Sequence, residues 1–210
     1  MIKVLIADDH TVVRRGLKQI LAETSDMVVE DEATNGIEVL EKVRNREFDV
    51  VVLDLSMPGK SGLEALRELK QDYPKLPVLI LSMYSEDQYA VRMLKAGAAG
   101  YLSKEDASEE LVNAIRKAFA GGKYVSPSVA EKLAAHIDTQ SEKSPHEILS
   151  DREHQVMCMI ASGKTPMQIA NELVLSVKTI STYRTRILEK MSMKTNAELT
   201  HYAIKNNLVE

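Results

Sequence analysis

Acidic, hydroxyl and amine side chains stand at the ends of separate apolar runs in the first half of the chain. Asp8 and Asp9 follow the first run, and Asp54 ends the third. Ser82 ends the fourth run, and Lys104 comes two residues after the fifth. Carboxylates that meet in one place repel each other unless a cation or a proton intervenes, and oxygen ligands suit Mg²⁺. If these groups converge, we expect a magnesium site that supports phosphate chemistry.

The apolar runs predict five β-strands, and the amphipathic stretches between them predict helices. The strands are expected at residues 2–7, 27–29, 50–53, 78–81 and 100–102. This alternation indicates βαβ units, hence a five-stranded parallel, doubly wound α/β sheet covered on both faces. Ligands bind such a sheet beyond the carboxyl ends of its strands, where the polar groups would meet. We expect the first helix to turn Arg14 and Lys18 away from the core, and His10 to be a loop residue, since magnesium prefers oxygen ligands.

Composition favours a cytoplasmic globular protein. The 210 residues are 44% hydrophobic and 28% charged, and the sequence has no apolar run of the length that a membrane span needs. The first residues carry neither the basic region nor the cleavage site of a secretory signal. Cys158 is the only cysteine, which excludes an internal disulfide framework and a Cys-based zinc site.

Charge and patterning divide the chain into two domains and a linker. Residues 1–122 carry 16 Lys and Arg against 21 Asp and Glu, a net charge of −5. Residues 123–147 carry a net charge of −1 and read as a linker with a possible short helix from residue 126 to 137. Residues 148–210 carry 8 basic against 6 acidic side chains, a net charge of +2. The acidic first domain and the basic second domain indicate two different partners.

The second domain reads as four short helices. Ser150 with Glu153, Thr165 with Gln168, and Thr195 with Glu198 have the spacing of a capping box, which marks a helix start. Ser176 can cap the remaining helix. Only Val174 and Leu175 lie between the second and third helices, and this spacing predicts a helix-turn-helix.

The third of these helices has two faces. The apolar face is expected to pack on the other helices and comprises Ile180, Tyr183, Ile187, Leu188 and Met191. The opposite polar face comprises Lys178, Ser181, Thr182 and Thr185, with Arg184 and Arg186 beside it. Such a face suits the major groove of double-stranded DNA, with short side chains at the bases and cations on the phosphates. Thr179 and the first N–H groups of the helix can meet a phosphate.

The polar groups of the first domain, together with Met57-Pro58-Gly59 and Tyr101, resemble the receiver domain of bacterial two-component response regulators. The resemblance covers residues 1 to about 122. It implies that Asp54 is phosphorylated and that Asp8, Asp9, Asp54 and the backbone carbonyl of Ser56 hold Mg²⁺. It also implies that Ser82 and Lys104 contact the phosphoryl group. Tyr101 is either a switch residue or a plain core aromatic.

The second domain resembles the DNA-binding domain of LuxR-type regulators through residues 149–153, 169–170 and 175–180. With a receiver in front, this is the arrangement of the NarL/FixJ family, and residues 181–186 and 198–204 are most similar to the branch that includes GacA and UvrY. The resemblance implies a phosphorylation-activated transcription factor whose partners are a sensor histidine kinase and double-stranded DNA. It implies no enzyme activity beyond the chain's own phosphoryl transfer and dephosphorylation.

The resemblance also implies a homodimer, formed through residues 196–205 when the protein is phosphorylated or bound to DNA. From the residues alone, Leu199, Ala203 and Ile204 fit either such an interface or the domain's own core. Two other functions stay open. A magnesium-dependent phosphatase of the haloacid dehalogenase type normally needs Asp-x-Asp after the first strand, where this chain has Asp8-Asp9-His10. A constitutive DNA binder would use the first domain for dimerisation only.

Overall fold

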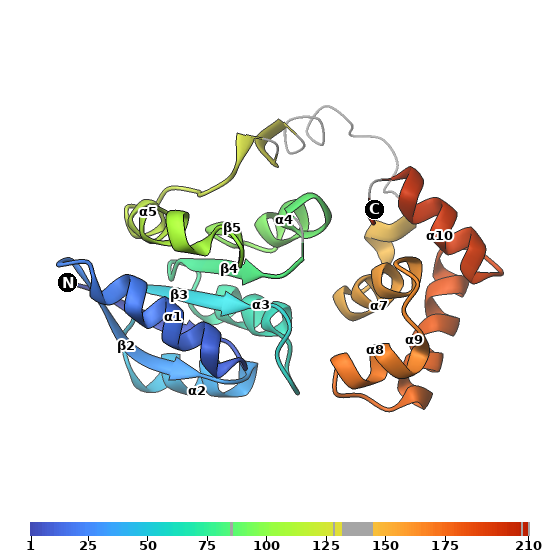
Figure 1. Cartoon of the computed structure of the whole chain (residues 1–210), viewed down its shortest axis with the longest axis horizontal. Helices are drawn as coiled ribbons and strands as arrows, with labels where there is room; N and C mark the ends of the chain where they lie inside the picture. The colour runs from blue at the N-terminus through green and yellow to red at the C-terminus, as the bar shows by residue number, and fades with distance from the viewer. Residues whose placement is uncertain (85, 128, 132–144, 207, 210) are drawn as a thin grey trace. The chain divides into compact units, whose positions relative to one another are not determined.

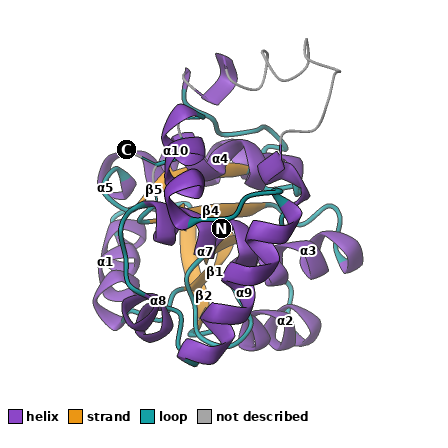
Figure 2. Ribbon diagram, turned by 90° about the vertical axis from the view of Figure 1, so that its right-hand side faces the viewer, coloured by secondary structure: helices purple, strands orange, loops and turns teal. Residues whose placement is uncertain are grey.

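The computed structural model describes the chain except for residues 85, 128, 132–144, 207 and 210. The chain divides into two compact units, with the division after residue 133 (Figure 1). All strands of the described residues belong to the first unit, and the second unit is helical (Figure 2). Among the described helices, none has the length and apolarity to cross a membrane.

The first unit is built on a five-stranded parallel sheet in the order β2-β1-β3-β4-β5. Its strands are β1 (Ile2–Ala7), β2 (Met27–Ala33), β3 (Val50–Asp54), β4 (Val78–Ser82) and β5 (Gly100–Ser103). The strand order reverses between β1 and β3, which is where a doubly wound sheet opens a crevice for ligands. The predicted fold class is confirmed.

Helices cover both faces of this sheet. They are α1 (Thr11–Ala22), α2 (Gly36–Asn45), α3 (Gly62–Asp72), α4 (Glu86–Lys95) and α5 (Ala107–Phe119). On one face Leu21 and Ile115 of α1 and α5 pack in one apolar cluster, and on the other Val39, Leu66 and Met93 of α2, α3 and α4 pack in a second. Burying apolar surface on both sides explains why the central strands are almost wholly apolar.

β3, β4 and β5 each end one residue later than the sequence pattern predicts, and β2 is longer by four residues. β2 continues to Ala33, four residues past the predicted end at residue 29, through the polar stretch from Glu30 to Glu32. β2 lies at the edge of the sheet, where the side chains between its buried end residues are half-buried or exposed. Polar residues are tolerated at an edge, so the apolar run ended before the strand did.

The segment after α5 packs against the first unit. Tyr124 forms a parallel bridge with Gly100, and Val129 is buried in the cluster that covers one face of the sheet. A Cβ on Gly100 would lie 2.6 Å from the Tyr124 carbonyl oxygen, so this close approach requires glycine. Residues 132–144 of the predicted linker, which include half of its possible short helix, lie outside the described residues. The domain limits at 122 and 148 stay predictions.

The second unit holds a short 3₁₀ turn, η1, and four described helices around their own apolar core. They are η1 (Pro145–Ile148), α7 (Asp151–Ala161), α8 (Pro166–Glu172), α9 (Val177–Lys190) and α10 (Asn196–Lys205). The capping boxes at Ser150 and Thr165 form as predicted. The third is only half formed: Thr195 accepts from the N–H of Glu198, but the Glu198 carboxylate accepts from the N–H of Lys194 instead of Thr195.

Candidate functional sites

The carboxylates of the first unit meet at the carboxyl end of the sheet. In the parallel register of β1 and β3, Ala7 lies opposite Leu53, so the next residues, Asp8 and Asp54, leave the sheet side by side. Each of Asp8, Asp9, His10 and Asp54 offers a ligand atom, and these atoms lie within 4.8 Å of one another. Asp8 and Asp54 are buried, at 1% and 2% exposure, whereas Asp9 faces the surface. The structure therefore brings together the acidic residues predicted from the sequence.

Lys104 lies between the two buried carboxylates. Its Nζ is 2.9 Å from Asp54 Oδ2, to which it donates, and 2.7 Å from Asp8 Oδ2. The backbone N–H of Lys104 donates to the Ser82 carbonyl, which fixes the end of β5 against the end of β4. The predicted convergence of Lys104 on the acidic residues is thus present.

Electrostatics in this site favour a further cation. Burial raises the pKa of Asp54, and the Asp8 charge adds to this effect while Lys104 opposes it. Burial alone would lower the pKa of Lys104, but the Asp54 and Asp8 carboxylates outweigh it and raise that pKa. One ammonium thus faces two buried carboxylates, with Asp9 a third at the surface.

The donor set fits Mg²⁺. Asp8 Oδ2 is buried, and the Lys104 ammonium that lies 2.7 Å from it is shared with Asp54. Carboxylate oxygens around an uncompensated negative charge are what a hard divalent ion binds. Ser56 lies beside them, since its backbone N–H donates to Asp54 Oδ1 at 3.3 Å. The ligand role of its carbonyl oxygen stays a prediction.

His10 lies in the loop before α1, as predicted, and also contacts the acidic cluster. It stands in the turn before α1, as its N-cap, and its N–H donates to Asp8 Oδ1 at 2.8 Å. Its ring Nδ1 lies 2.9 Å from Asp9 Oδ1 and 3.1 Å from Asp8 Oδ1. His10 thus helps to hold the two carboxylates, a role that its position directly after them in a tight turn could have suggested.

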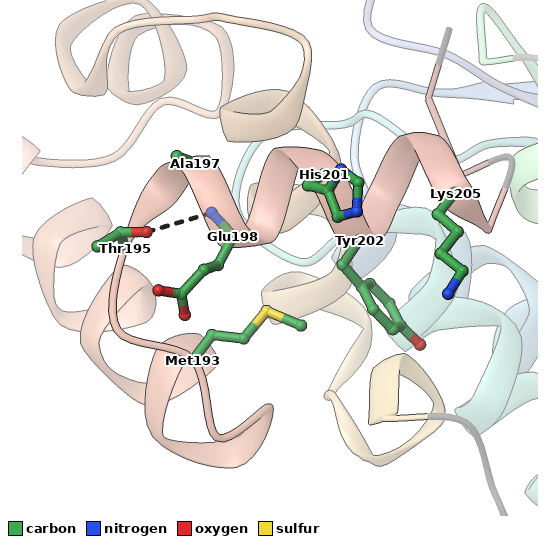
Figure 3. Close-up of a pocket in the computed structure, with 7 residues that line it drawn as sticks. All are labelled: Met193, Thr195, Ala197, Glu198, His201, Tyr202 and Lys205. Atoms are coloured by element: carbon green, nitrogen blue, oxygen red, sulfur yellow. Dashed lines mark hydrogen bonds between the residues drawn. The ribbon is translucent and has the colours of Figure 1, made fainter.

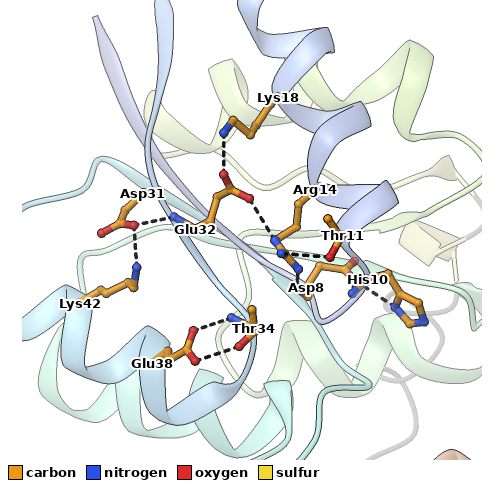
Figure 4. A network of polar contacts seen from close by, with 10 residues as sticks. All are labelled: Asp8, His10, Thr11, Arg14, Lys18, Asp31, Glu32, Thr34, Glu38 and Lys42. Atoms are coloured by element: carbon orange, nitrogen blue, oxygen red, sulfur yellow. Dashed lines mark hydrogen bonds and ion pairs between the residues drawn. The ribbon is translucent and has the colours of Figure 1, made fainter.

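Arg14 is the functional residue that the helical pattern missed. We expected it to face away from the core, but its side chain is only 12% exposed. Its Nη1 donates to the Asp8 backbone carbonyl at 2.7 Å, and its Nε donates to Glu32 at 3.0 Å. Lys18 holds the other Glu32 oxygen at 2.6 Å, and Lys18 and Arg14 together lower the pKa of Glu32. Figure 4 shows this network, which ties α1 and β2 to the backbone of the acidic turn.

Ser82 and Tyr101 meet at the backbone of Tyr84. The buried Ser82 Oγ accepts from the Tyr84 N–H at 3.2 Å, and the buried Tyr101 hydroxyl donates to the Tyr84 carbonyl at 2.8 Å. Tyr101 is thus a core aromatic in this conformation. The shared partner nevertheless links it to the hydroxyl at the end of β4, so a role as a switch stays open.

In the second unit, α8, a short turn and α9 form the predicted helix-turn-helix. Val174 in the turn has φ of +53°, a left-handed conformation that β-branched residues rarely adopt. Ile180, Ile187 and Leu188 of α9 are buried, as is Met191 directly after it, and Tyr183 packs partly buried against them. The predicted apolar face of this helix is confirmed.

The opposite face of α9 is open to solvent. Its exposed members are Lys178, Ser181, Thr182, Thr185 and Arg186, while Thr179 and Arg184 are half-buried. Arg184 Nε donates to Asn196 Oδ1 at 2.6 Å, whereas Arg186 has no side-chain partner among the residues that the structure describes. Arg184 therefore braces the start of α10, whereas Arg186 extends from an exposed position.

The structure separates the three apolar residues of α10. Leu199 and Ala203 are fully buried in the core of the second unit, whereas Ile204 is 52% exposed. A surface hollow runs along this helix and is lined by Met193, Thr195, Ala197, Glu198, His201, Tyr202 and Lys205 (Figure 3). The core thus accounts for two of the three residues, and only Ile204 is left for an interface.

Comparison with protein families matches both units. Residues 4–116 match the family described as response regulator receiver domain. Residues 147–203 match the family described as bacterial regulatory proteins, luxR family.

Similar proteins match this chain over nearly the whole length of both sequences. "Response regulator GacA" of Pseudomonas syringae pv. syringae is 41% identical, over 100% of this chain and 99% of that protein. "Response regulator UvrY" of Escherichia coli is 38% identical, over 99% of this chain and 96% of that protein. Among solved structures, RcsB of Salmonella enterica serovar Typhimurium, bound to promoter rprA in the presence of phosphomimetic BeF3⁻, has a TM-score of 0.64 at 25% identity. That match covers 96% of this chain and 98% of that one.

Proposed function

The chain belongs to the NarL/FixJ family of two-component response regulators, which are phosphorylation-dependent transcription regulators, and from this premise we propose that Asp54 is its phosphorylation site. The proposed donor is a phosphohistidine of a sensor histidine kinase. The observation that carries the proposal is the pairing of two buried carboxylates with one buried lysine: Lys104 Nζ lies 2.9 Å from Asp54 and 2.7 Å from Asp8.

Each residue of the acidic site has a proposed role in the transfer. An oxygen of the Asp54 carboxylate attacks phosphorus while the P–N bond of the phosphohistidine breaks, and the imidazole leaves with the kinase. Burial raises the pKa of Asp54, which makes its oxygens more basic than those of a solvated carboxylate. Lys104 lies where its ammonium can contact an oxygen of the incoming phosphoryl group, and Ser82 can donate its hydroxyl proton to another. Asp8, Asp9, Asp54 and the carbonyl of Ser56 are the proposed ligands of Mg²⁺. When bound, Mg²⁺ supplies positive charge for the phosphoryl oxygens.

The proposed coupling runs from Ser82 through Tyr84 to Tyr101. If Ser82 turns toward a phosphoryl oxygen, it gives up its contact with the Tyr84 N–H. The Tyr84 carbonyl is also the acceptor of the Tyr101 hydroxyl, so a movement at one residue alters the anchor of the other. This geometry supports Tyr101 as a switch residue.

The second unit is proposed to place α9 in the major groove of double-stranded DNA. Ser181, Thr182 and Thr185 would face the bases, while Lys178, Thr179, Arg184 and Arg186 would contact phosphates. The contact of Arg184 with Asn196 makes it a weaker candidate for phosphate contact than Arg186. The similar RcsB structure, in which that protein is bound to promoter DNA with a phosphomimetic present, supports the link between phosphorylation and DNA.

Two copies are proposed to pair on DNA through α10. The exposed Ile204 and the hollow along this helix offer an apolar surface that a second copy can cover. A pair related by a two-fold axis would read two half-sites of a palindrome. We further propose that the protein acts in the cytoplasm and catalyses no reaction beyond its own phosphorylation and dephosphorylation.

A binding experiment tests this function. The full chain, treated with magnesium and a small acyl phosphate, is applied to a random DNA library, and an untreated sample is run in parallel. We expect one palindromic motif, bound more tightly by the treated protein, and no gain for Asp54→Asn. Equal affinity with and without the phosphodonor would favour the constitutive DNA binder, and turnover of a phosphomonoester would favour the phosphatase.

A further inference from the structure

The hydroxyl groups on the exposed face of α9 all donate to their own helix. Ser181 Oγ donates to the Val177 carbonyl at 3.0 Å, and Thr182 Oγ1 donates to the Lys178 carbonyl at 3.0 Å. Thr185 Oγ1 donates to the Ser181 carbonyl at 3.1 Å. Each bond reaches back four residues and uses the single proton of its hydroxyl. This shared arrangement determines what the face can offer to a ligand.

These side chains present acceptors and methyl groups outward. A hydroxyl oxygen has two lone pairs, which stay available when its proton is engaged. Thr182 and Thr185 also carry a methyl group, whereas Ser181 does not. All three residues are exposed, on the side of α9 opposite its buried apolar face. The centre of the face is therefore poor in hydrogen-bond donors, and the cations, Lys178 and Arg186, stand at its ends.

We propose that Ser181, Thr182 and Thr185 read adenine or cytosine through their oxygens, and that the threonine methyl groups read thymine. This inference rests on the proposed placement of α9 in the major groove. There adenine N6 and cytosine N4 are the base donors, guanine offers only acceptors, and thymine exposes a methyl group. An A·T pair satisfies both kinds of contact, with the amino group of one base and the methyl group of the other. Reading guanine would require a hydroxyl to break its bond to the helix.

Paired substitutions separate the two contacts. Thr182→Val keeps the shape and one methyl in place but removes the oxygen, whereas Thr182→Ser keeps the hydroxyl and removes the methyl. The same pair is made at Thr185. Ser108→Val, at an exposed position of α5 in the first unit, is the control for the effect of valine on a helix outside the face. Circular dichroism and low-salt binding to random DNA verify that each variant is folded.

The DNA is changed so that one contacting group at a time is removed from a base, as the substitutions remove one group at a time from the protein. After the motif of the full chain has been selected, single adenines are replaced by purine, which lacks the amino group, and single thymines by uracil, which lacks the methyl. We expect wild-type binding to weaken about 3- to 10-fold at the contacted adenine, the effect of one hydrogen bond. Thr182→Val should be insensitive to that replacement but still sensitive to uracil, and Thr182→Ser should show the reverse.

The outcomes distinguish this inference from the function on which it rests. A selection that enriches no motif overturns both the DNA-binding function and the inference. A motif whose positions ignore the purine and uracil replacements overturns the inference alone. The same holds if the threonine variants keep the sensitivities of the wild type to both analogues.

Discussion

At the scale of the residue, the acidic site is defined by an imbalance of buried charge. Asp8 and Asp54 are both nearly inaccessible, and Lys104 is the cation that both contact among the described residues. Burying a charge is costly unless it is compensated, and one ammonium compensates only one carboxylate. The site is therefore less stable alone than with a bound cation, which links magnesium binding to the stability of the fold.

Asp54→Asn should raise the free energy of unfolding in the absence of magnesium. Burial raises the pKa of Asp54 in the folded state, so folding favours its protonated form relative to the unfolded chain. Wild-type stability should therefore fall as the pH rises from the unfolded pKa of Asp54 through its folded pKa, and the variant should lack this loss. The measurement is urea unfolding with a chelator present, followed by circular dichroism.

Magnesium should reverse the order of the two proteins. An ion that binds only the folded state adds about 2.7 kcal/mol at 100 times its dissociation constant. The wild type should gain this stabilisation and Asp54→Asn much less of it. A variant that is less stable than the wild type in chelator, or equally stabilised by magnesium, would be inconsistent with the proposed site.

Arg14→Lys should weaken magnesium binding although Arg14 is not a proposed ligand. The guanidinium contacts both the Asp8 carbonyl and Glu32, and a lysine cannot make the two contacts in that geometry. Groups that orient metal ligands typically affect affinity 10- to 100-fold, and we expect a loss of about 10-fold. Arg15→Lys is the control, since Arg15 is its exposed neighbour on α1. Equal magnesium affinities for both variants would remove Arg14 from the site.

At the scale of the element, the helix-turn-helix carries backbone strain. Val174 adopts φ of +53° and leaves its side chain 69% exposed, so it gains little from burial. Non-glycine residues in this conformation cost about 1–3 kcal/mol, and asparagine tolerates it better than valine. Val174→Asn should stabilise the second unit by about 1 kcal/mol in thermal unfolding. Val177→Asn, in the first turn of α9, should not stabilise the second unit. If it stabilised the unit as much as Val174→Asn does, the backbone conformation of Val174 would not be the cause.

Glu153 connects α7 to α9 and makes the second unit sensitive to acid. Burial would raise the pKa of this carboxyl, but the hydrogen bonds from Lys190 and from Ser150 outweigh it and lower the pKa. Its contribution to stability is thus complete above the unfolded pKa of glutamate, about 4.3, and is lost as the pH falls through the lowered folded value. Glu153→Gln should destabilise the unit at neutral pH and have a smaller effect at about pH 3. An effect that does not diminish with acid would show that the charge is irrelevant.

The sequence predicted those elements whose pattern follows directly from burial. Apolar runs located all five strands, since the central ones are covered on both sides, and the site residues followed from their positions at strand ends. Polar residues that owe their position to tertiary contacts were not predictable in this way. The polar half of β2 pairs at an edge, and Arg14 is drawn inward by Glu32 and a backbone carbonyl. The Glu198 carboxylate accepts from the N–H of Lys194 and not from that of Thr195. The spacing of a capping box cannot tell which of these two neighbouring N–H groups the carboxylate binds.

At the scale of the whole molecule, the two units have opposite electrostatic character. Residues 1–122 carry a net charge of −5, and residues 148–210 carry +2. The acidic unit is suited to a divalent cation, which can in turn attract a phosphoryl group, while the basic unit is suited to the DNA backbone. A phosphoryl group on Asp54 would add negative charge to the first unit alone. Phosphorylation therefore changes the charge of the first unit and leaves the chemistry of the second unit, which carries the proposed DNA-contacting surface, unchanged.

Phosphorylation of Asp54 can be tested by measuring the mass of the intact chain after incubation with a small acyl phosphate. We expect the wild type to gain one phosphoryl group when magnesium is present and none when it is chelated, and Asp54→Asn to gain none in either condition. Uptake by Asp54→Asn equal to that of the wild type, or no uptake by the wild type with magnesium, would refute Asp54 as the phosphorylation site.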